Sequence, residues 1–392
     1  MPVLADFESC TGCTACYNAC AHDAIRMQAD AEGFVFPNVN RDRCVECGLC
    51  TDRCPVLYPL RTGNADTPSV YALWSEKDRT ASSSGGAFSA FARKVLAEKG
   101  IVWGAAFDGM LKCRHVRACN LNALAALRGS KYVQSELGRS FSKIKKELQQ
   151  GISVLFCGTP CQVAGLYSYL HKDYENLLTL DLVCHGVPSD AVFQAYLSKL
   201  SKKKRIDIEG LEFRRLSGWG IATTAKLGNK SRLLYGYDNL YMQAFDRSAL
   251  FRRSCYSCRY ARLPRVGDCT IGDFWGIGRH GTPFRHDVSR GVSLVMANNA
   301  KGEKALSGLA GVFIERRTLE EALAENHNIM HPSVKHPQRD KIIRSFLDTS
   351  KSLGEIASVY GLVDKSVKGA VKDLMCRLNM YNAAKSVYNK LK

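Results

Sequence analysis

Two cysteine runs with the same spacing dominate the first 60 residues of the chain. Both follow the pattern C-x2-C-x2-C-x3-C, the first at Cys10, Cys13, Cys16 and Cys20, the second at Cys44, Cys47, Cys50 and Cys54. Three thiolates on a tight loop can each bind one iron of a cubane cluster, while the fourth reaches a second cluster. The runs therefore predict two [4Fe-4S] clusters, one on Cys10, Cys13, Cys16 and Cys54, the other on Cys44, Cys47, Cys50 and Cys20.

Gly12 and Gly48 lie within these runs, where a residue without a side chain lets backbone N–H groups approach a cluster. Paired zinc sites are the alternative, because C-x2-C is also a zinc spacing, but two matching runs favour iron. Over about 50 residues the segment resembles a bacterial two-cluster ferredoxin. Ala21 stands where that family usually has proline, a position that binds no iron. The resemblance implies single-electron transfer.

Composition limits the class of protein. The chain has 392 residues, 17 of them cysteine, with 23% charged and 46% hydrophobic residues, which excludes a disordered or collagen-like chain. No apolar run approaches the roughly 20 residues that span a bilayer, and the N-terminus lacks the pattern of a secretion signal. We therefore expect a cytoplasmic protein, in which cysteines bind metal rather than form disulfides.

The formal net charge of +18 would by itself favour a nucleic-acid partner. Three oxidised clusters would subtract about 6 charges, and a dinucleotide pyrophosphate about 2 more. Cofactors and a redox partner then account for much of the charge. We expect no nucleic-acid partner.

The rest of the chain alternates between strand-like and helix-like segments, which predicts an α/β body. Strands are expected at 70–74, 101–107, 153–157 and 177–184, and helices at 85–99, 141–150 and 162–170. Shorter strands are expected over 206–277. Thr318 with Glu321 predicts a capping box that opens a helix through about Asn326.

Four further cysteines have contexts typical of a metal site. Cys161 follows Gly-Thr-Pro at a strand-to-helix turn, Cys184 ends the next predicted strand, and Cys255 and Cys258 form a C-x2-C pair. The first two emerge at the carboxyl edge of a parallel sheet, where α/β proteins place their sites. Four thiolates suffice for a third cubane. The alternative is a zinc knuckle at Cys255 and Cys258, with the other two merely buried.

Five separated segments of the body carry a recognisable pattern. They are Ser82-Ser-Ser-Gly-Gly-Ala-Phe88, Gly129-Ser-Lys-Tyr-Val-Gln-Ser135, Gly158-Thr-Pro-Cys-Gln162, Cys184-His-Gly186 and Gly267-Asp-Cys-Thr-Ile-Gly-Asp-Phe-Trp-Gly276. In this order they resemble the coenzyme F420 hydrogenase/dehydrogenase beta-subunit family over residues 70–340. The resemblance implies an iron–sulfur flavoprotein that binds FAD, with the third cluster on Cys161, Cys184, Cys255 and Cys258.

The Ser82–Gly86 turn precedes a predicted helix, so its free N–H groups and the positive helix end can receive a pyrophosphate. We expect the FAD to contact Ser83, Ser84, Gly85 and Gly86, with Lys131 as the cationic group beside it. A plain helix cap and a surface lysine are the alternatives.

Two other cysteines, Cys157 and Cys269, could substitute in the third set or form a redox pair. Cys157 also suits the core of its strand, and the family usually has an aliphatic residue at position 269. No catalytic residue is assigned.

The predicted fold class is α/β (mixed α+β), with four segments. They are a two-cluster ferredoxin-like domain at 1–60, the N-terminal part of the family-like body at 70–150, its C-terminal part with the iron–sulfur and flavin site at 151–340, and a basic helical tail at 341–392. The tail is interpreted as an appendage with a solvated face, or else as a contact for a membrane surface or a partner.

These features predict an FAD- and [4Fe-4S]-dependent oxidoreductase. Electrons would pass between an FAD-bound hydride donor or acceptor, coenzyme F420 or another substrate, and the clusters, and then to a ferredoxin-type partner. Two alternatives stay open. One is a ferredoxin-dependent reductase of a polysaccharide precursor, and the other is a non-catalytic electron-transfer subunit of a larger complex.

Overall fold

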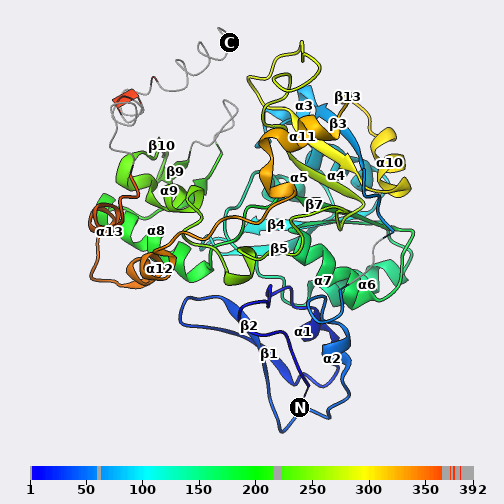
Figure 1. The fold of residues 1–392 in the computed structure, drawn as a ribbon, viewed down its shortest axis with the longest axis horizontal. Helices are drawn as coiled ribbons and strands as arrows, with labels where there is room; N and C mark the ends of the chain where they lie inside the picture. The colour runs from blue at the N-terminus through cyan, green and yellow to red at the C-terminus, as the bar shows by residue number, and fades with distance from the viewer. Residues whose placement is uncertain are drawn as a thin grey trace.

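The computed structural model describes residues 2–59, 63–214 and 223–363, with the single residues 371, 374, 375 and 380. Figure 1 shows a small N-terminal domain, in blue, beneath a body whose central sheet is covered by helices. A helical lobe lies beside the body. None of the helices over the described residues combines the length and the apolar character that crossing a bilayer requires.

The N-terminal domain consists of two short helices and one hairpin. In chain order these are α1 (Ala15–Ala19), β1 (Ile25–Ala29), β2 (Val35–Val39) and α2 (Leu49–Asp52), with the two strands antiparallel. Ile25 and Phe34 are buried, but few other large apolar side chains are. So small a core leaves the cysteine loops as the main organising feature of this domain.

The body is built on an eight-stranded sheet. Four central strands run parallel, in the order β11 (Cys269–Asp273), β7 (Leu177–Leu182), β6 (Val154–Gly158) and β4 (Ile101–Phe107). The antiparallel strands are β5 (Cys113–Ala118) at one edge and β12 (Ser293–Ala297), β3 (Ser69–Trp74) and β13 (Phe313–Arg317) toward the other. Because the parallel strands end at one edge, the turns after them meet there.

Helices cover both faces of this sheet. One face packs against α4 (Ala87–Ala97), α5 (Leu121–Leu127) and α10 (Ala300–Ser307). The other packs against α6 (Ser140–Gln149), α7 (Pro160–Leu170) and α11 (Leu319–Glu325), and α3 (Glu76–Arg79) follows β3. Leu155 and Phe156 of β6 are fully buried in opposite faces, as expected for a central parallel strand.

The helical lobe has a core of its own. It contains α8 (Asp190–Lys204), α9 (Leu240–Asp246), α12 (Arg339–Leu347), α13 (Leu353–Tyr360) and an antiparallel sheet of β8 (Gly210–Glu212), β9 (Thr224–Leu227) and β10 (Lys230–Leu233). Short 3-10 turns lie at η1 (Gly236–Asn239), η2 (Arg253–Cys255) and η3 (His327–Ile329).

The described part of the predicted tail belongs to this lobe. Ile342, Ile343 and Phe346 of α12 are fully buried, and α12 packs against α8. The predicted boundary at residue 341 therefore falls inside α12, and this helix is not a solvated appendage. Most of the tail beyond residue 363 lies outside the described residues.

The mixed α/β fold with a ferredoxin-type N-terminal domain confirms the predicted fold class. The predicted strands correspond to β3, β4, β6 and β7 and the predicted helices to α4, α6 and α7, with ends that agree within two residues. Helix α9 was missed within 206–277, because its residues are buried almost all round and show no apolar–polar period.

The predicted capping box at α11 is incomplete. Thr318 Oγ1 accepts a hydrogen bond from the Glu321 N–H at 3.2 Å, as expected. The Glu321 carboxylate does not return to the cap, because it pairs with Arg317 at 2.7 Å and accepts from the Gly278 N–H at 2.8 Å. The Glu321 side chain therefore bonds to tertiary partners and not to the backbone N–H of the N-cap residue.

Candidate iron–sulfur centre

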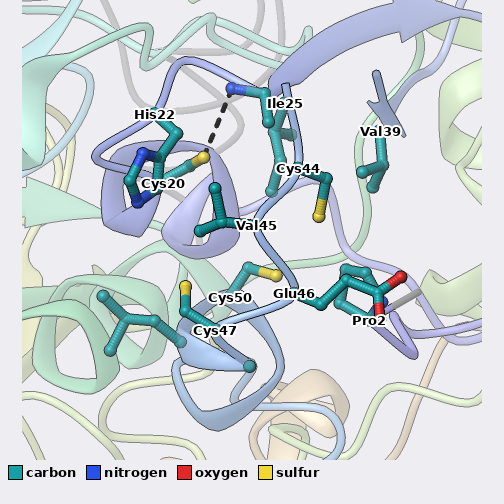
Figure 2. A pocket seen from close by; sticks show the side chains of 13 residues that line it. Pro2, Cys20, His22, Ile25, Val39, Cys44, Val45, Glu46, Cys47 and Cys50 are labelled. Atoms are coloured by element: carbon teal, nitrogen blue, oxygen red, sulfur yellow. Dashed lines mark hydrogen bonds between the residues drawn. The ribbon is translucent and has the colours of Figure 1, made fainter. Parts of the chain in front are cut away.

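Two cavities of similar size lie in the N-terminal domain, each lined by four cysteines. The first, about 350 Å³ including its open mouth, is lined by Cys10, Cys13, Cys16 and Cys54. The second, about 360 Å³ on the same measure, is lined by Cys20, Cys44, Cys47 and Cys50 (Figure 2). These groupings are the two ligand sets that the spacing predicts, so the residues present fit two cubanes of equal size.

The exchange of the fourth cysteine follows from two short helices. Cys16 lies in α1, and Cys20 is the residue at which α1 ends, so one helix serves both cavities. Cys50 lies in α2, and Cys54 follows shortly after that helix. The last cysteine of each run thus lies at or beyond a helix end and lines the cavity of the other run.

The two cysteine loops share one backbone conformation although their glycines are placed differently. In the first loop the left-handed residues are Gly12 (φ +68°) and Thr14 (φ +63°). In the second they are Glu46 (φ +53°) and Gly48 (φ +74°) at the equivalent positions. Only one residue of each pair is glycine, and the other holds a conformation that costs of order 1 kcal/mol or more. Left-handed conformations repeated at matching positions indicate that both loops serve the same purpose.

Burial and mutual repulsion act on the thiols of the first cavity. Burial, with smaller contributions from the neighbouring Cys10, Cys54 and Cys161, raises the pKa of Cys13 to about 12. Cys161 belongs to the body, not to the N-terminal domain. The first cavity therefore lies next to the third set of cysteines.

The third set is assembled from three distant parts of the chain. Cys161 lies in the first turn of α7, Cys184 follows the end of β7, and Cys255 and Cys258 lie at and just after η2. Burial raises the pKa of Cys161 to about 12 and that of Cys255 to about 11. Burial also raises the pKa of Cys184, and the other three cysteines of the set add to that shift, so the four lie together.

No three Cys, His, Asp or Glu side chains within the described ranges converge closely enough to hold a single metal ion. A zinc site needs such convergence, because all of its ligands bind one ion. A cubane does not, because each thiolate binds a different iron.

Helix α7 brings the third set to the N-terminal domain. Gly165, one turn after Cys161, faces the first cavity, and a Cβ atom there would lie 2.8 Å from the Cys13 Cβ and 3.0 Å from its sulfur. Ser168 Oγ on the same helix donates to the Arg53 carbonyl at 3.0 Å. Figure 1 shows α1 directly below α7, consistent with these contacts.

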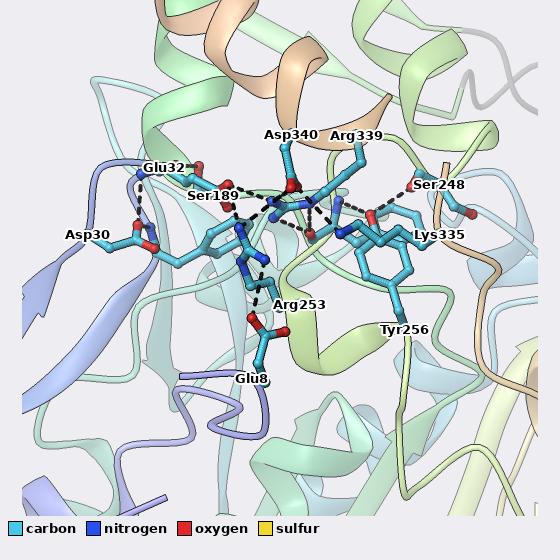
Figure 3. A network of polar contacts seen from close by, with 12 residues as sticks. Glu8, Asp30, Glu32, Ser189, Ser248, Arg253, Tyr256, Lys335, Arg339 and Asp340 are labelled. Atoms are coloured by element: carbon cyan, nitrogen blue, oxygen red, sulfur yellow. Dashed lines mark hydrogen bonds and ion pairs between the residues drawn. The ribbon is translucent and has the colours of Figure 1, made fainter. Parts of the chain in front are cut away.

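An ion-pair network fastens the other side of the domain (Figure 3). Glu32, in the turn between β1 and β2, pairs with Arg339 at 2.6 Å and with Arg253 at 3.5 Å. Arg253 also pairs with Glu8 at 3.2 Å, and Ser189 Oγ donates to the Glu32 carbonyl at 2.6 Å. The N-terminal domain is thus attached to both the body and the helical lobe.

The segments predicted to hold FAD lie side by side. Ser83 Oγ accepts hydrogen bonds from the Ser130 N–H at 2.9 Å and from its hydroxyl at 3.0 Å, and Ser84 Oγ donates to the Val292 carbonyl at 2.9 Å. Lys131 Nζ donates to two carbonyls at the end of α5, and burial lowers its pKa to about 8. Lys131 is therefore not an ordinary surface lysine.

The backbone of the Ser82–Gly86 turn fits an anionic group. Among the described residues, the N–H groups of Ser83, Ser84, Gly85 and Gly86 have no hydrogen-bond acceptor, and α4 begins directly after them. Gly85 cannot carry a side chain, since a Cβ would lie 2.2 Å from the Leu73 carbonyl. The nearby Asp78 is paired with Arg93 at 2.8 Å and with Arg128 at 3.1 Å, so its charge is balanced.

One residue beside this turn, Arg214, was not predicted from the sequence. The buried Arg214 forms a two-bond pair with Asp273 at 2.7 and 3.0 Å, and it donates to the Ser83 carbonyl at 3.1 Å. Its guanidinium lies 5.3 Å from the Trp275 ring centre. Nothing in the sequence distinguishes it from the other arginines, because its role comes from partners far along the chain.

His185 extends this group toward the third set. Burial lowers its pKa, and the charges of Asp273 and Arg214 act on it. Cys184 precedes it directly in the chain. The charges of the Arg214–Asp273 pair, which contacts the Ser82–Gly86 turn, therefore act on the residue that follows Cys184.

Two segments of the chain match known protein families. Residues 152–321 match the family of the C-terminal region of the coenzyme F420 hydrogenase/dehydrogenase beta subunit, and residues 9–57 match the 4Fe-4S dicluster domain. These two segments belong to those families. No curated protein matches the chain. A chain of the F420-reducing [NiFe] hydrogenase complex from Methanosarcina barkeri is 15% identical, with 76% of this chain and 94% of that chain covered and a TM-score of 0.44.

The predicted resemblance and the [4Fe-4S] clusters of the ferredoxin-type domain are thereby confirmed. The third cluster, the FAD and the use of coenzyme F420 stay predictions.

Within the F420 hydrogenase/dehydrogenase-type domain, Cys157 and Cys269 do not join the third set. Cys269 is fully buried at the start of β11, close to Gly302, and packs in the core. The Cys157 carbonyl lies 3.0 Å from His115 Nε2, and burial raises the pKa of its thiol to about 12. Both positions fit core residues of the sheet.

Proposed function

We propose that this iron–sulfur oxidoreductase binds FAD beside the Ser82–Gly86 turn and a third [4Fe-4S] cluster on Cys161, Cys184, Cys255 and Cys258. Electrons pass between the FAD and that cluster, through the first and second cavities of the ferredoxin-type domain, and on to a redox partner. The observation that carries the proposal is the unbroken series of sites from the surface of the domain to the serine turn.

Each step of the series rests on a contact. Helix α1 joins the second cavity to the first. Gly165 of α7 packs on Cys13 and so joins the first cavity to the third set. His185, Asp273 and Arg214 then connect the third set to Ser83. Such contacts keep successive sites close enough for single electrons to pass.

The protein positions the groups, and the bound cofactors supply the redox chemistry. Clusters accept and release single electrons, and FAD exchanges a hydride or two electrons and a proton. The open N–H groups of the serine turn would hold the pyrophosphate. Arg214, whose charge is paired with Asp273, would hold the turn in place through the Ser83 carbonyl. Lys131 stays our candidate for a cationic contact with the FAD.

The second cavity is the proposed port for the partner. Cys47 is exposed, and the neighbouring Val45 side chain is 59% exposed. An exposed ligand with an apolar neighbour allows another redox protein to approach that site closely. The partner's identity and the small-molecule substrate, coenzyme F420 or a polysaccharide precursor, belong to the same proposal.

The test is the iron, sulfide and flavin content of anaerobically purified protein, with visible spectra before and after dithionite. Three clusters predict about twelve irons, together with one FAD per chain. Coenzyme F420 oxidation would be assayed next. About eight irons without flavin would contradict the proposal and favour a non-catalytic relay.

A further inference from the structure

The largest fully buried side chains of the described residues include three arginines: Arg252, Arg265 and Arg339. Arg265 pairs with Asp181 at 3.0 Å, and Arg339 pairs with Glu32 at 2.6 Å (Figure 3). Arg252 has no carboxylate partner among the described residues. A buried cation normally requires a nearby anion, so Arg252 lacks what the other two have.

All polar contacts of the Arg252 side chain are with neutral groups. Its Nε donates to the Cys10 carbonyl at 2.7 Å, and its Nη2 donates to the Val35 carbonyl at 3.0 Å. Its Nη1 lies 3.4 Å from Gln134 Oε1, and the guanidinium lies 4.1 Å from the Phe36 ring centre. These groups accept three hydrogen bonds from the guanidinium, but none of the described residues in contact with it balances its positive charge.

Arg252 lies between two of the cysteine sets. On the first-cavity side its Nη1 is 3.0 Å from the position that a Gly12 Cβ would take, next to the Cys10 carbonyl. On the other side its own carbonyl accepts from the Cys255 N–H at 3.0 Å.

We propose that Arg252 is the shared counter-ion of the clusters held by the Cys10 set and the Cys161 set. This inference rests on the proposed function for the third cluster. An oxidised [4Fe-4S](Cys)4 cluster carries net charge −2, and one-electron reduction adds a further negative charge. A fixed buried cation stabilises the reduced form more than the oxidised form. Arg252 therefore raises the reduction potentials of these two clusters above the value that each would have without it.

The second cavity provides an internal reference. No contact of Arg252 involves a residue that lines that cavity. Removal of the charge should therefore change the reduction potentials of the Cys10-set and Cys161-set clusters. The potential of the second-cavity cluster should stay almost unchanged. Arg252 acts here through its positive charge and is not a ligand of either cluster.

The experiment is a potentiometric titration of the holoprotein with dithionite, followed by electron paramagnetic resonance, for wild type, Arg252→Gln and Arg252→Lys. We expect Arg252→Gln to lower two of the three midpoints. At a fixed potential the ratio of reduced to oxidised cluster should fall at least tenfold for each affected cluster, which corresponds to 59 mV for a one-electron couple. Arg252→Lys keeps the charge and should shift the midpoints less.

Arg139→Gln is the matched control. Arg139 also joins the body to the N-terminal domain, donating to the Tyr17 carbonyl at 2.8 Å, but it has its own carboxylate in Asp23. Its removal should leave all midpoints unchanged. Unchanged midpoints in Arg252→Gln with full iron content would overturn the proposal and leave Arg252 a purely structural residue.

Gln134→Glu keeps the test decisive if Arg252→Gln fails to assemble. It places a carboxylate beside Arg252 Nη1, where the amide oxygen now lies at 3.4 Å, and so balances the charge without removing the arginine. The same two midpoints should fall, and unchanged midpoints would again overturn the inference. If the wild type itself holds only eight irons, the proposed third cluster is absent. The midpoint potential of the Cys10-set cluster alone then tests the role of Arg252.

Discussion

The two cavities of the N-terminal domain and the third cysteine set differ in how they are built. Each cavity draws three cysteines from one loop of seven residues and the fourth from the other run. The third set draws Cys161, Cys184 and the Cys255–Cys258 pair from three separate elements of the body. A local site depends on loop conformation, whereas the third set depends on the whole sheet and its turns.

This difference matters for stability. The N-terminal domain has a small core and strained loops, so we expect its clusters to contribute much of its folding free energy. The body has large cores on both faces of the sheet, so we expect it to fold without a cluster. Loss of both ferredoxin-type clusters should therefore unfold the small domain, whereas loss of the proposed third cluster should leave the body folded.

The test with the largest expected effect replaces Cys54, the cysteine that the second run contributes to the first cavity. Cys54→Ser should remove the cluster of the first cavity, although Cys54 belongs to the second run. Electron transfer between the partner port and the body should then fall by at least about 100-fold, because the middle site is gone. Stopped-flow reduction and magnetic-resonance spectra would measure this loss.

Cys119→Ser is the control, because Cys119 is exposed and lines neither cavity. A spectrum of Cys54→Ser that lacks the second-cavity cluster instead would show that the ligand sets are not exchanged.

The next test removes one ligand of the third set. Cys184→Ser should lower the iron content by about four per chain and leave both ferredoxin-type clusters and the fold intact. Cys269→Ser should keep all the iron, because Cys269 lies in the core away from the set. Iron analysis and circular dichroism check both variants. Equal iron loss in the two variants would contradict our assignment.

A third prediction concerns the contact between the two regions. Gly165→Ala should destabilise the protein by about 1–3 kcal/mol, because the new methyl group meets Cys13 at 2.8 Å. It should also slow electron transfer between the domain and the body. Gly109→Ala is the matched control, since a Cβ there has no neighbour within 4 Å. Anaerobic denaturant titrations measure the difference, and equal stability would show that the contact adjusts freely.

The smallest expected effect involves Lys131 in the body. Burial lowers its pKa from 10.5 to about 8, so the unfolded chain binds more protons between these two pH values. Wild-type stability should therefore rise relative to Lys131→Met as the pH increases from 8 to 10.5. Below pH 8 the gap should be constant. The difference between the two pKa values sets an upper limit of about 3 kcal/mol on the total change, and the partly exposed side chain should give less.

Thermal midpoints of both proteins, measured under argon across this pH range, test the Lys131 linkage. Lys94→Met, which removes a lysine at the surface, is the control. A gap between wild type and Lys131→Met that does not change with pH would mean that the charge of Lys131 is not buried.

Features that depend on short spacings could be predicted from the amino-acid sequence alone. The cysteine runs predicted which four residues line each cavity, and the apolar patterns predicted β4 and α7 because their periods fit within one element. The resemblance of five short segments predicted the family. These signals are local, so no knowledge of distant contacts was required.

Other features of the fold and the site depend on tertiary contacts and could not be predicted. Helix α9 and the packing of α12 depend on a core shared with distant segments, which removes the polar face that a sequence pattern needs. Arg252 and Arg214 look like any other arginine in the sequence, yet burial makes one an unpaired cation and the other a partner of Asp273. Desolvation and long-range contacts set the properties of such groups, and neither is written in the neighbouring residues.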